Sequence, residues 1–231
     1  MEKYTVVIPA AGQGKRMNAG MNKQFICMDH IPLLIHTLRV FEEDLLCRSI
    51  VLVVNPDERN AVAELLQDYN IRKVGKLVRG GKERQQSVYE GLKAMEEGGI
   101  VLVHDGARPF IDHSIIHKLV RTAGTKGAAT VATRVKDTIK QVEAGQVKAT
   151  VDRSCLWAVQ TPQAFRHTEL LEAHRKAEIE GFEATDDASI IEFVGAPVYI
   201  VEGDYENIKI TTPEDIVFGE AIISNRKEEQ G

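Results

Sequence analysis

Short, continuous apolar runs recur along the chain and lack the apolar–polar alternation of a half-exposed strand. They are rich in β-branched residues, which is typical of strands buried on both faces of a parallel sheet. The runs that predict strands are 4–10, 49–55, 100–105, 128–135 and 196–203.

Between these runs, apolar residues recur at the three- and four-residue spacing of an amphipathic helix. Leu34, Leu38 and Phe41 form such a face, and Asp57 is a candidate N-cap for a later helix. The segments with this pattern are 32–44, 57–69, 83–95 and 113–124. Alternating strands and helices predict a single α/β domain over residues 1–231, with a doubly wound, mostly parallel, Rossmann-like sheet.

The segment of about 136–153 departs from this pattern, because apolar and polar residues alternate on both sides of Ala144-Gly145. Such alternation around a short turn predicts a β-hairpin. A two-stranded hairpin is marginally stable alone, so it has to pack on something, and a second subunit is a good candidate. We therefore expect a protruding dimerisation arm and a homodimer.

Composition narrows the class of protein. The formal net charge is −5, so no basic excess predicts a nucleic-acid partner. No apolar run approaches the ~20 residues of a membrane span, and the N-terminus enters the first predicted strand without a signal-peptide layout. The 3 cysteines have no metal-binding spacing. Together these features predict a cytoplasmic protein with reduced thiols and no membrane association.

The first predicted strand runs into the sequence PAAGQGKRM, residues 9–17. Small residues let a ligand approach the backbone closely, and successive N–H groups in such a turn attract anions. The same residues could also form only a tight strand-to-helix turn. The sequence is not a Walker A loop, and it is a poor dinucleotide fingerprint because Met17 stands where the third glycine belongs.

A second candidate site follows the strand at 100–105, in the sequence HDGARPF. Asp105 at the strand end could hold Mg²⁺, which binds one or two carboxylates together with substrate phosphates. Asp105 could equally be a helix cap or a turn residue. Arg108 could bind a phosphate with two parallel hydrogen bonds or brace the loop. His104 would point to the other face and is interpreted as structural.

Later segments supply further polar candidates. Arg153 ends the predicted hairpin, and Lys209 is expected on a strand or at its edge. Each could be an ordinary exposed cation. Thr161 precedes a predicted proline turn, and Thr185 opens the sequence TDDAS, which could be only a helix N-cap cluster. The run from Thr212 predicts a helix that starts at the following proline.

The first loop resembles the signature of sugar-phosphate nucleotidyltransferases, AAGxGxRM followed by PKQ, with Asn22 in place of the proline. Further motifs resemble the 2-C-methyl-D-erythritol 4-phosphate cytidylyltransferase family, in order from residue 9 to 215. They are PAAGQGKRM, NKQF, GGKERQQSV, LVHDGARPF, VKDTIK, VDRSCLW, TPQAF, TDDAS and NIKITTPED. Gly106 stands where that family usually has alanine.

The resemblance implies roles for individual residues. It implies nucleotide binding by Ala10, Ala11, Gly12, Gly14, Gly80, Gly81 and Ser87. It implies charge neutralisation in the transition state by the catalytic residues Arg16 and Lys23. It implies Mg²⁺ binding by Asp105, with other divalent cations possible. It implies positioning of the acceptor by Arg153 and Lys209, with Arg108, Thr138, Thr161 and Thr185 nearby.

The resemblance also implies a reaction. CTP and 2-C-methyl-D-erythritol 4-phosphate would give 4-diphosphocytidyl-2-C-methyl-D-erythritol and pyrophosphate, in the non-mevalonate isoprenoid pathway. The hairpin would cross to the partner subunit, where Thr138 and Arg153 would complete the neighbouring site.

Three other functions compete. A ribitol-5-phosphate cytidylyltransferase shares most motifs, but its loop resembles AGG and its arm lacks the VDRxxLW pattern found at 151–157. A Rossmann oxidoreductase is disfavoured by the missing third glycine and by Asn55, where a ribose-binding acid is wanted. A non-catalytic nucleotide-binding regulator would not need Asp105, Lys23 and Lys209 together.

Overall fold

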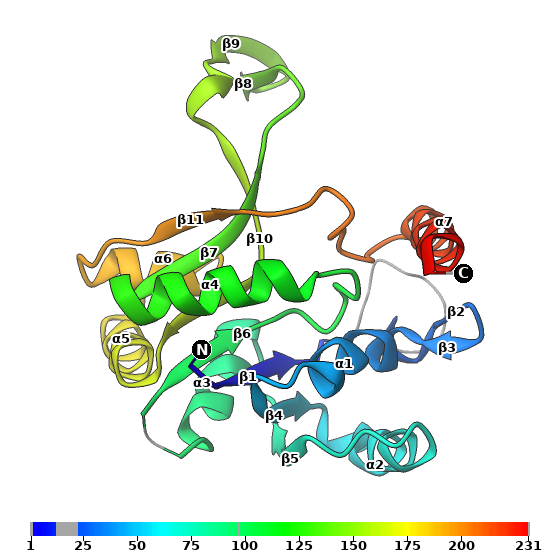
Figure 1. Cartoon of the computed structure of the whole chain (residues 1–231). Helices are drawn as coiled ribbons and strands as arrows, with labels where there is room; N and C mark the ends of the chain where they lie inside the picture. Colours follow the sequence, from blue (N-terminus) through cyan, green and yellow to red (C-terminus); the bar gives the residue numbers. More distant parts are fainter. Residues whose placement is uncertain (1, 13–22, 97, 231) are drawn as a thin grey trace.

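A computed structural model of the chain describes residues 2–12, 23–96 and 98–230. Its centre is a 7-stranded sheet with the order β11-β7-β10-β6-β1-β4-β5 (Figure 1). The strands are β1 (Tyr4–Pro9), β4 (Cys47–Val54), β5 (Val74–Arg79), β6 (Ile100–Val103), β7 (Ala128–Arg134), β10 (Trp157–Arg166) and β11 (Tyr199–Glu202). Only β10 runs antiparallel to its neighbours among these strands. The predicted mostly parallel α/β fold is confirmed.

Helices cover both faces of the sheet, because successive side chains of each central strand point to opposite sides and are apolar on both. Val6 and Ile8 of β1 face one core, whereas Val7 faces the other. The first core contains side chains of α1 (Leu33–Glu43), α2 (Arg59–Asp68) and α4 (His113–Lys126). The second contains those of α3 (Arg84–Lys93), α5 (His167–Glu180) and α6 (Asp187–Phe193).

An antiparallel hairpin of β8 (Ile139–Glu143) and β9 (Gln146–Val151) stands out from the body of the molecule (Figure 1). Ala144 and Gly145 form its turn with φ of 47° and 79°, so both positions adopt the left-handed conformation of a tight hairpin. Val142 and Val147 are 55% and 61% exposed. The hairpin lies where the sequence predicts one, and its role in dimerisation stays a prediction.

The predicted proline turn at 161–165 is wrong. These residues belong to β10, whose pairing with β7 is irregular between Val159 and Gln163. A proline removes a ladder hydrogen bond, and such irregular positions are where strands tolerate it. The N-cap prediction for Asp57 is also wrong, because the side chain of Asn55 accepts a hydrogen bond from the Asp57 N–H and caps the short helix η3 (Pro56–Glu58).

The last helix, α7 (Pro213–Gln230), begins at the predicted proline. The Asp215 carboxylate in its first turn accepts hydrogen bonds from the backbone N–H groups of Thr211 and Thr212. The helix packs closely through Gly219, where a Cβ atom would lie 2.8 Å from the Met28 sulfur. Among the described residues, no helix has the length and apolarity to cross a membrane.

Candidate active site

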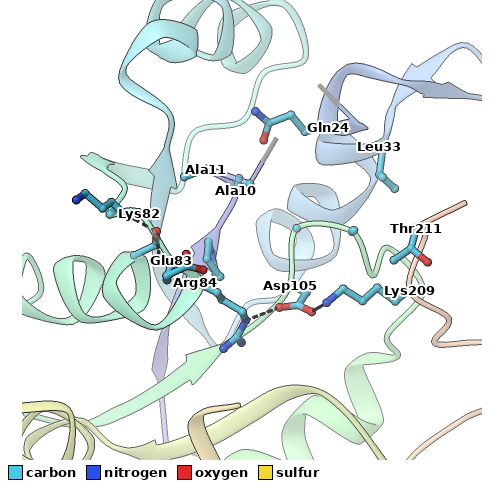
Figure 2. A pocket seen from close by; sticks show the side chains of 16 residues that line it. Ala10, Ala11, Gln24, Leu33, Lys82, Glu83, Arg84, Asp105, Lys209 and Thr211 are labelled. Atoms are coloured by element: carbon cyan, nitrogen blue, oxygen red, sulfur yellow. Dashed lines mark hydrogen bonds and ion pairs between the residues drawn. The ribbon is translucent and has the colours of Figure 1, made fainter. Parts of the chain in front are cut away.

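A cavity of about 340 Å³ opens at the carboxyl ends of β1 and β6 (Figure 2). The sheet order reverses at this pair of strands, since β4 continues on one side of β1 and β6 lies on the other. Open α/β sheets bind ligands at such a switch point. The lining comes from residues 9–12, 81–84 and 105–107, together with Gln24, Leu33, Ser87, Lys209 and Thr211.

The glycine-rich wall of the cavity is held by backbone contacts. The N–H groups of Ala10 and Gly80 donate to the carbonyls of Val53 and Val54, at 2.7 and 2.9 Å. A Cβ atom on Gly80 would lie 2.4 Å from the Ala11 Cβ, so this approach requires glycine. Ala10, Ala11 and Gly12 line the cavity, whereas Gly80 packs against Ala11 and is not among the lining residues.

Ser87 has a structural task in the predicted base pocket. Its hydroxyl accepts a hydrogen bond from the Gly81 N–H at 3.1 Å and donates to the Glu83 carbonyl at 3.0 Å. The hydroxyl therefore fixes the loop 80–83, and its one proton is already engaged. Gly81 and Ser87 both line the cavity.

Asp105 lies at the floor of the cavity between two cations (Figure 2). Arg84 Nε and Lys209 Nζ lie 3.1 and 2.5 Å from its two carboxylate oxygens. Burial alone would raise the pKa of Asp105, but the attraction of Arg84 and then of Lys209 is stronger and holds that pKa well below its usual range. The carboxylate is therefore ionised at neutral pH.

Arg84 is the functional side chain that the sequence reasoning missed. Besides Asp105 it binds Asp187, with 2.8 Å between Arg84 Nη1 and a carboxylate oxygen. Asp187 is 103 residues away in sequence and fully buried, so no local pattern connects the two. The motif GGKERQQSV contains Arg84 and could have drawn attention to it.

Lys209 reaches the cavity from an irregular segment, and its predicted place on a strand is wrong. The segment is fixed nearby by the Ile210 N–H, which donates to the Ala107 carbonyl at 2.8 Å. This bond ties the Lys209 backbone to the loop that carries Asp105. The two side chains therefore meet although they are far apart in sequence.

Two candidates near Asp105 brace the loop. The Thr161 hydroxyl accepts a hydrogen bond from the Asp105 N–H at 3.0 Å and also contacts His104 Nδ1 at 3.2 Å. Arg108 Nη1 donates to the Asn207 carbonyl at 2.6 Å. His104 is fully buried and is structural, as predicted from its position.

The remaining candidates are not brought to the cavity. Thr138 and Arg153 lie at the exposed base of the hairpin, where Arg153 Nη1 donates to the Lys136 carbonyl. Thr185 is exposed just before α6. The next residue, Asp186, forms the capping box of that helix with Ser189, so the helix-cap interpretation of this segment is confirmed.

Gly14 and Arg16 lie outside the described residues. For Lys23 the structure describes the backbone, which opens the short helix η2 (Lys23–Phe25). Its neighbour Gln24 lines the cavity and donates from Nε2 to a Glu58 carboxylate oxygen at 2.6 Å. This bond ties η2 to η3 beside the cavity.

The cavity offers a single carboxylate to a metal ion. The described residues contain no group of three or more histidine, cysteine or acidic side chains able to hold a metal. Asp105 supplies one ionised and buried carboxylate. One carboxylate suits Mg²⁺ whose other ligands are phosphate oxygens and water, and it does not suit a permanently bound ion.

Comparison with known proteins identifies the family. A model of the 2-C-methyl-D-erythritol 4-phosphate cytidylyltransferase family matches residues 4–225. The chain belongs to this family. The enzyme of that name from Geobacillus thermodenitrificans is 56% identical, over 96% of this chain and 98% of its own length. The one from Bacillus pumilus is 57% identical over 95% and 96%.

Solved structures agree with this assignment. The 4-diphosphocytidyl-2C-methyl-D-erythritol synthase of Anaerococcus prevotii superposes with a TM-score of 0.85 at 32% identity, covering 96% of each chain. The 2-C-methyl-D-erythritol 4-phosphate cytidylyltransferase of Thermus thermophilus gives 0.79 at 34% identity, covering 96% of this chain and 98% of its own. The chain is thus a nucleotidyltransferase of the cytidylyltransferase class, and the ribitol-5-phosphate alternative is not favoured.

Proposed function

We propose that this chain transfers the cytidylyl group of CTP to 2-C-methyl-D-erythritol 4-phosphate, giving 4-diphosphocytidyl-2-C-methyl-D-erythritol and pyrophosphate. The observation that carries the proposal is the position of Asp105 and Lys209 opposite the glycine-rich wall, in a cavity at the switch point of the sheet. The wall can follow a triphosphate closely, and the opposite side offers both a carboxylate and an ammonium group.

The reaction is an in-line displacement. An oxygen of the acceptor phosphate forms a bond to the α-phosphorus of CTP, and the bond from that phosphorus to the bridging oxygen of the β-phosphate breaks. Pyrophosphate leaves with the electron pair. Because both reactants are anions, catalysis rests on positioning and on neutralising charge. We assign neutralisation in the transition state to Arg16 and Lys23, and nucleotide contacts to residues 10–14, 80, 81 and 87.

We assign the metal to Asp105. When bound, Mg²⁺ would neutralise phosphate charge and orient the triphosphate. Lys209 Nζ lies 2.5 Å from one Asp105 oxygen, so the ammonium group and the metal would compete for that oxygen. With Asp105 holding the metal, Lys209 would bind the acceptor phosphate, which is the role we assign to it.

The rest of the acceptor site requires a second subunit in this proposal. Thr138 and Arg153 belong to the exposed hairpin and do not line the cavity of their own chain. The exposed valines of the hairpin also call for a partner surface. A homodimer that exchanges hairpins would provide both, with Arg153 reaching the acceptor and Arg108, Thr161 and Thr185 nearby.

We place this activity in the cytoplasm. All 3 cysteines are free thiols. Cys47 is buried, whereas Cys27 and Cys155 are exposed. Free thiols suit a reducing compartment. The proposed substrates are small phosphorylated metabolites, which are charged and do not cross membranes unaided.

A pyrophosphate-release assay tests the function. The protein should release pyrophosphate from CTP when 2-C-methyl-D-erythritol 4-phosphate is present, and much more slowly from ATP, GTP or UTP. Ribitol 5-phosphate serves as the competing acceptor. Equal or faster turnover with ribitol 5-phosphate would favour the alternative enzyme, and no release with either acceptor would contradict both.

A further inference from the structure

The carboxylate of Asp105 depends on side chains for its orientation. Its backbone N–H is fixed by Thr161, but its two oxygens have only Arg84 Nε and Lys209 Nζ as partners among the described residues. Figure 2 shows the three side chains in line across the floor of the cavity. Whatever holds these two cations therefore decides where the Asp105 oxygens point.

The two cations differ in how firmly they are held. Lys209 extends from an irregular segment, its side chain is 36% exposed, and Asp105 is its one ion-pair partner among the described residues. Arg84 starts helix α3 and binds a second carboxylate, Asp187, whose side chain is 1% exposed. A guanidinium group held by two carboxylates has much less freedom than an ammonium group held by one.

Asp187 is itself fixed from several directions. His174 Nε2 lies 3.2 Å from its second carboxylate oxygen and is equally buried. The backbone N–H groups of Asp187 and Ala188 both donate to the side-chain carbonyl of Gln163, at 3.1 and 3.0 Å. These contacts hold the Asp187 carboxylate between α5, α6 and strand β10. Because Arg84 binds both this carboxylate and Asp105, it links the fixed region to the cavity.

We propose that Arg84 is a positioning residue of the reaction: anchored on the buried Asp187, it holds one oxygen of Asp105 so that the other oxygen can exchange Lys209 for a divalent cation. The inference rests on the proposed role of Asp105 as metal ligand. Partners that orient a metal ligand typically contribute roughly 10- to 100-fold in metal affinity or activity. Arg84 should contribute on that scale without touching the metal.

The test measures Mn²⁺ binding to the protein–CTP complex, by the electron paramagnetic resonance signal of free Mn²⁺ and without acceptor. Arg84→Gln should weaken Mn²⁺ binding by roughly 10- to 100-fold. Asp187→Asn should weaken it in the same direction, because it removes the charge that anchors Arg84. Arg175→Gln is the matched control, since Arg175 forms an exposed ion pair with Glu172 on α5 and should leave Mn²⁺ binding unchanged.

The possible outcomes distinguish failure of the positioning role of Arg84 from failure of the metal assignment to Asp105. A folded Arg84→Gln protein with wild-type Mn²⁺ affinity would overturn the positioning role, even if its unfolding temperature falls. If Asp105→Asn also keeps wild-type Mn²⁺ affinity, the metal assignment itself is wrong. Weak binding in Asp105→Asn alone would leave the metal assignment standing and remove only the inference.

A second variant covers the case in which Arg84→Gln does not fold. Arg84→Lys keeps the positive charge, but an ammonium group cannot reproduce the two-sided fork of the guanidinium group. It should therefore also weaken Mn²⁺ binding, by less than the glutamine variant. Wild-type affinity in Arg84→Lys would contradict the proposal, because charge alone would then suffice.

Discussion

At the scale of single residues, we assign separate tasks to the cations around the proposed reaction centre. Lys209 already contacts Asp105 across the cavity, Arg153 lies on the hairpin, and Lys23 follows the glycine-rich loop. A side chain that binds the acceptor equally in the ground and transition states changes KM, whereas one that acts in the transition state changes kcat. Kinetics can therefore tell them apart.

We expect Lys209→Ala and Arg153→Ala to raise KM for the acceptor by roughly 10- to 100-fold, the scale of a charged hydrogen bond of about 1.5–3 kcal/mol. Lys23→Ala should instead lower kcat by about 10²–10³. Steady-state pyrophosphate release with varied acceptor measures both. Lys118→Ala, on the exposed side of α4, is the control. Unchanged CTP turnover in Lys23→Ala would contradict its role.

The two glycines of the cavity wall should respond differently to a methyl group. In Gly80→Ala the new Cβ would lie 2.4 Å from the Ala11 Cβ, so the wall has to move. We expect a loss of stability of about 1–3 kcal/mol and a higher KM for CTP. In Gly12→Ala the Cβ meets nothing within 4 Å among the described residues. That variant should keep its stability and raise only KM for CTP.

Urea unfolding and CTP kinetics of the two variants decide this prediction. If Gly80→Ala is as stable as the wild type, the close approach of the two backbones does not constrain the fold. If Gly12→Ala binds CTP normally, the wall does not approach the triphosphate at that residue.

At the scale of elements, burial explains which strands the sequence reveals. The runs that form β1, β4 and β6 are apolar on both faces because helices cover both sides of the sheet. Strand β5 is at the edge and mostly half-exposed or exposed, so it lacks a continuous apolar run. The apolar pattern does not predict strand β10, because this strand carries Pro162 and two buried glutamines, Gln160 and Gln163.

The place of each site residue in the fold likewise explains whether the sequence could predict it. Loops at the ends of predicted strands could be placed from sequence, because parallel strands end at one edge of the sheet. Lys209 could be chosen only through family resemblance, since it lies on no strand. Arg84 could be chosen only from the motif GGKERQQSV, because its anchor Asp187 lies in a helix that the periodicity did not predict.

The hairpin carries a prediction of its own. Val142→Lys together with Val147→Lys would place two charges on the surface that we expect to contact the partner subunit. Burying unpaired charge is costly, so the protein should become monomeric in light scattering. The acceptor KM should rise at the same time, because Arg153 and Thr138 would no longer reach the neighbouring site.

The matched control for the hairpin is Leu45→Lys. Leu45 is 89% exposed and lies beyond the end of α1, far along the chain from the hairpin. It should leave both the mass and the acceptor KM unchanged. A hairpin variant that stays dimeric, or a monomer with normal acceptor kinetics, would contradict the exchanged arrangement.

At the scale of the whole molecule, an acidic protein gathers cations at one cavity. The net charge is −5, yet the lining of the pocket holds three cations, Lys82, Arg84 and Lys209, against two acidic residues, Glu83 and Asp105. Local concentration of positive charge attracts anionic ligands although the total is negative. The same fold buries ionisable groups beneath that cavity, and their titration makes stability depend on pH.

Buried histidines and buried carboxylates make the free energy of unfolding depend on pH, each in a different pH range. Burial lowers the pKa of His104 to about 4, against a reference near 6.5. Burial likewise lowers the pKa of His36. Burial raises the pKa of Asp105 and Asp187, but their charged partners together, Arg84 with Lys209 and Arg84 with His174, outweigh burial and lower both pKa values. The stability that Asp105 and Asp187 contribute through these lowered pKa values is present above about pH 4 and is lost as the pH falls further.

Between about pH 6.5 and 4 the unfolded chain binds a proton at His104 that the folded protein does not bind. Stability should therefore fall as the pH falls through this window, by up to about 3 kcal/mol from this residue. Urea unfolding at several pH values between about 7 and 4.5 measures the slope.

His104→Gln should flatten that slope even if it lowers stability overall, because glutamine does not titrate. His30→Gln, in the exposed turn between β2 (Cys27–Met28) and β3 (Ile31–Pro32), should retain the wild-type slope. An undiminished slope in His104→Gln would show that the pH dependence arises elsewhere.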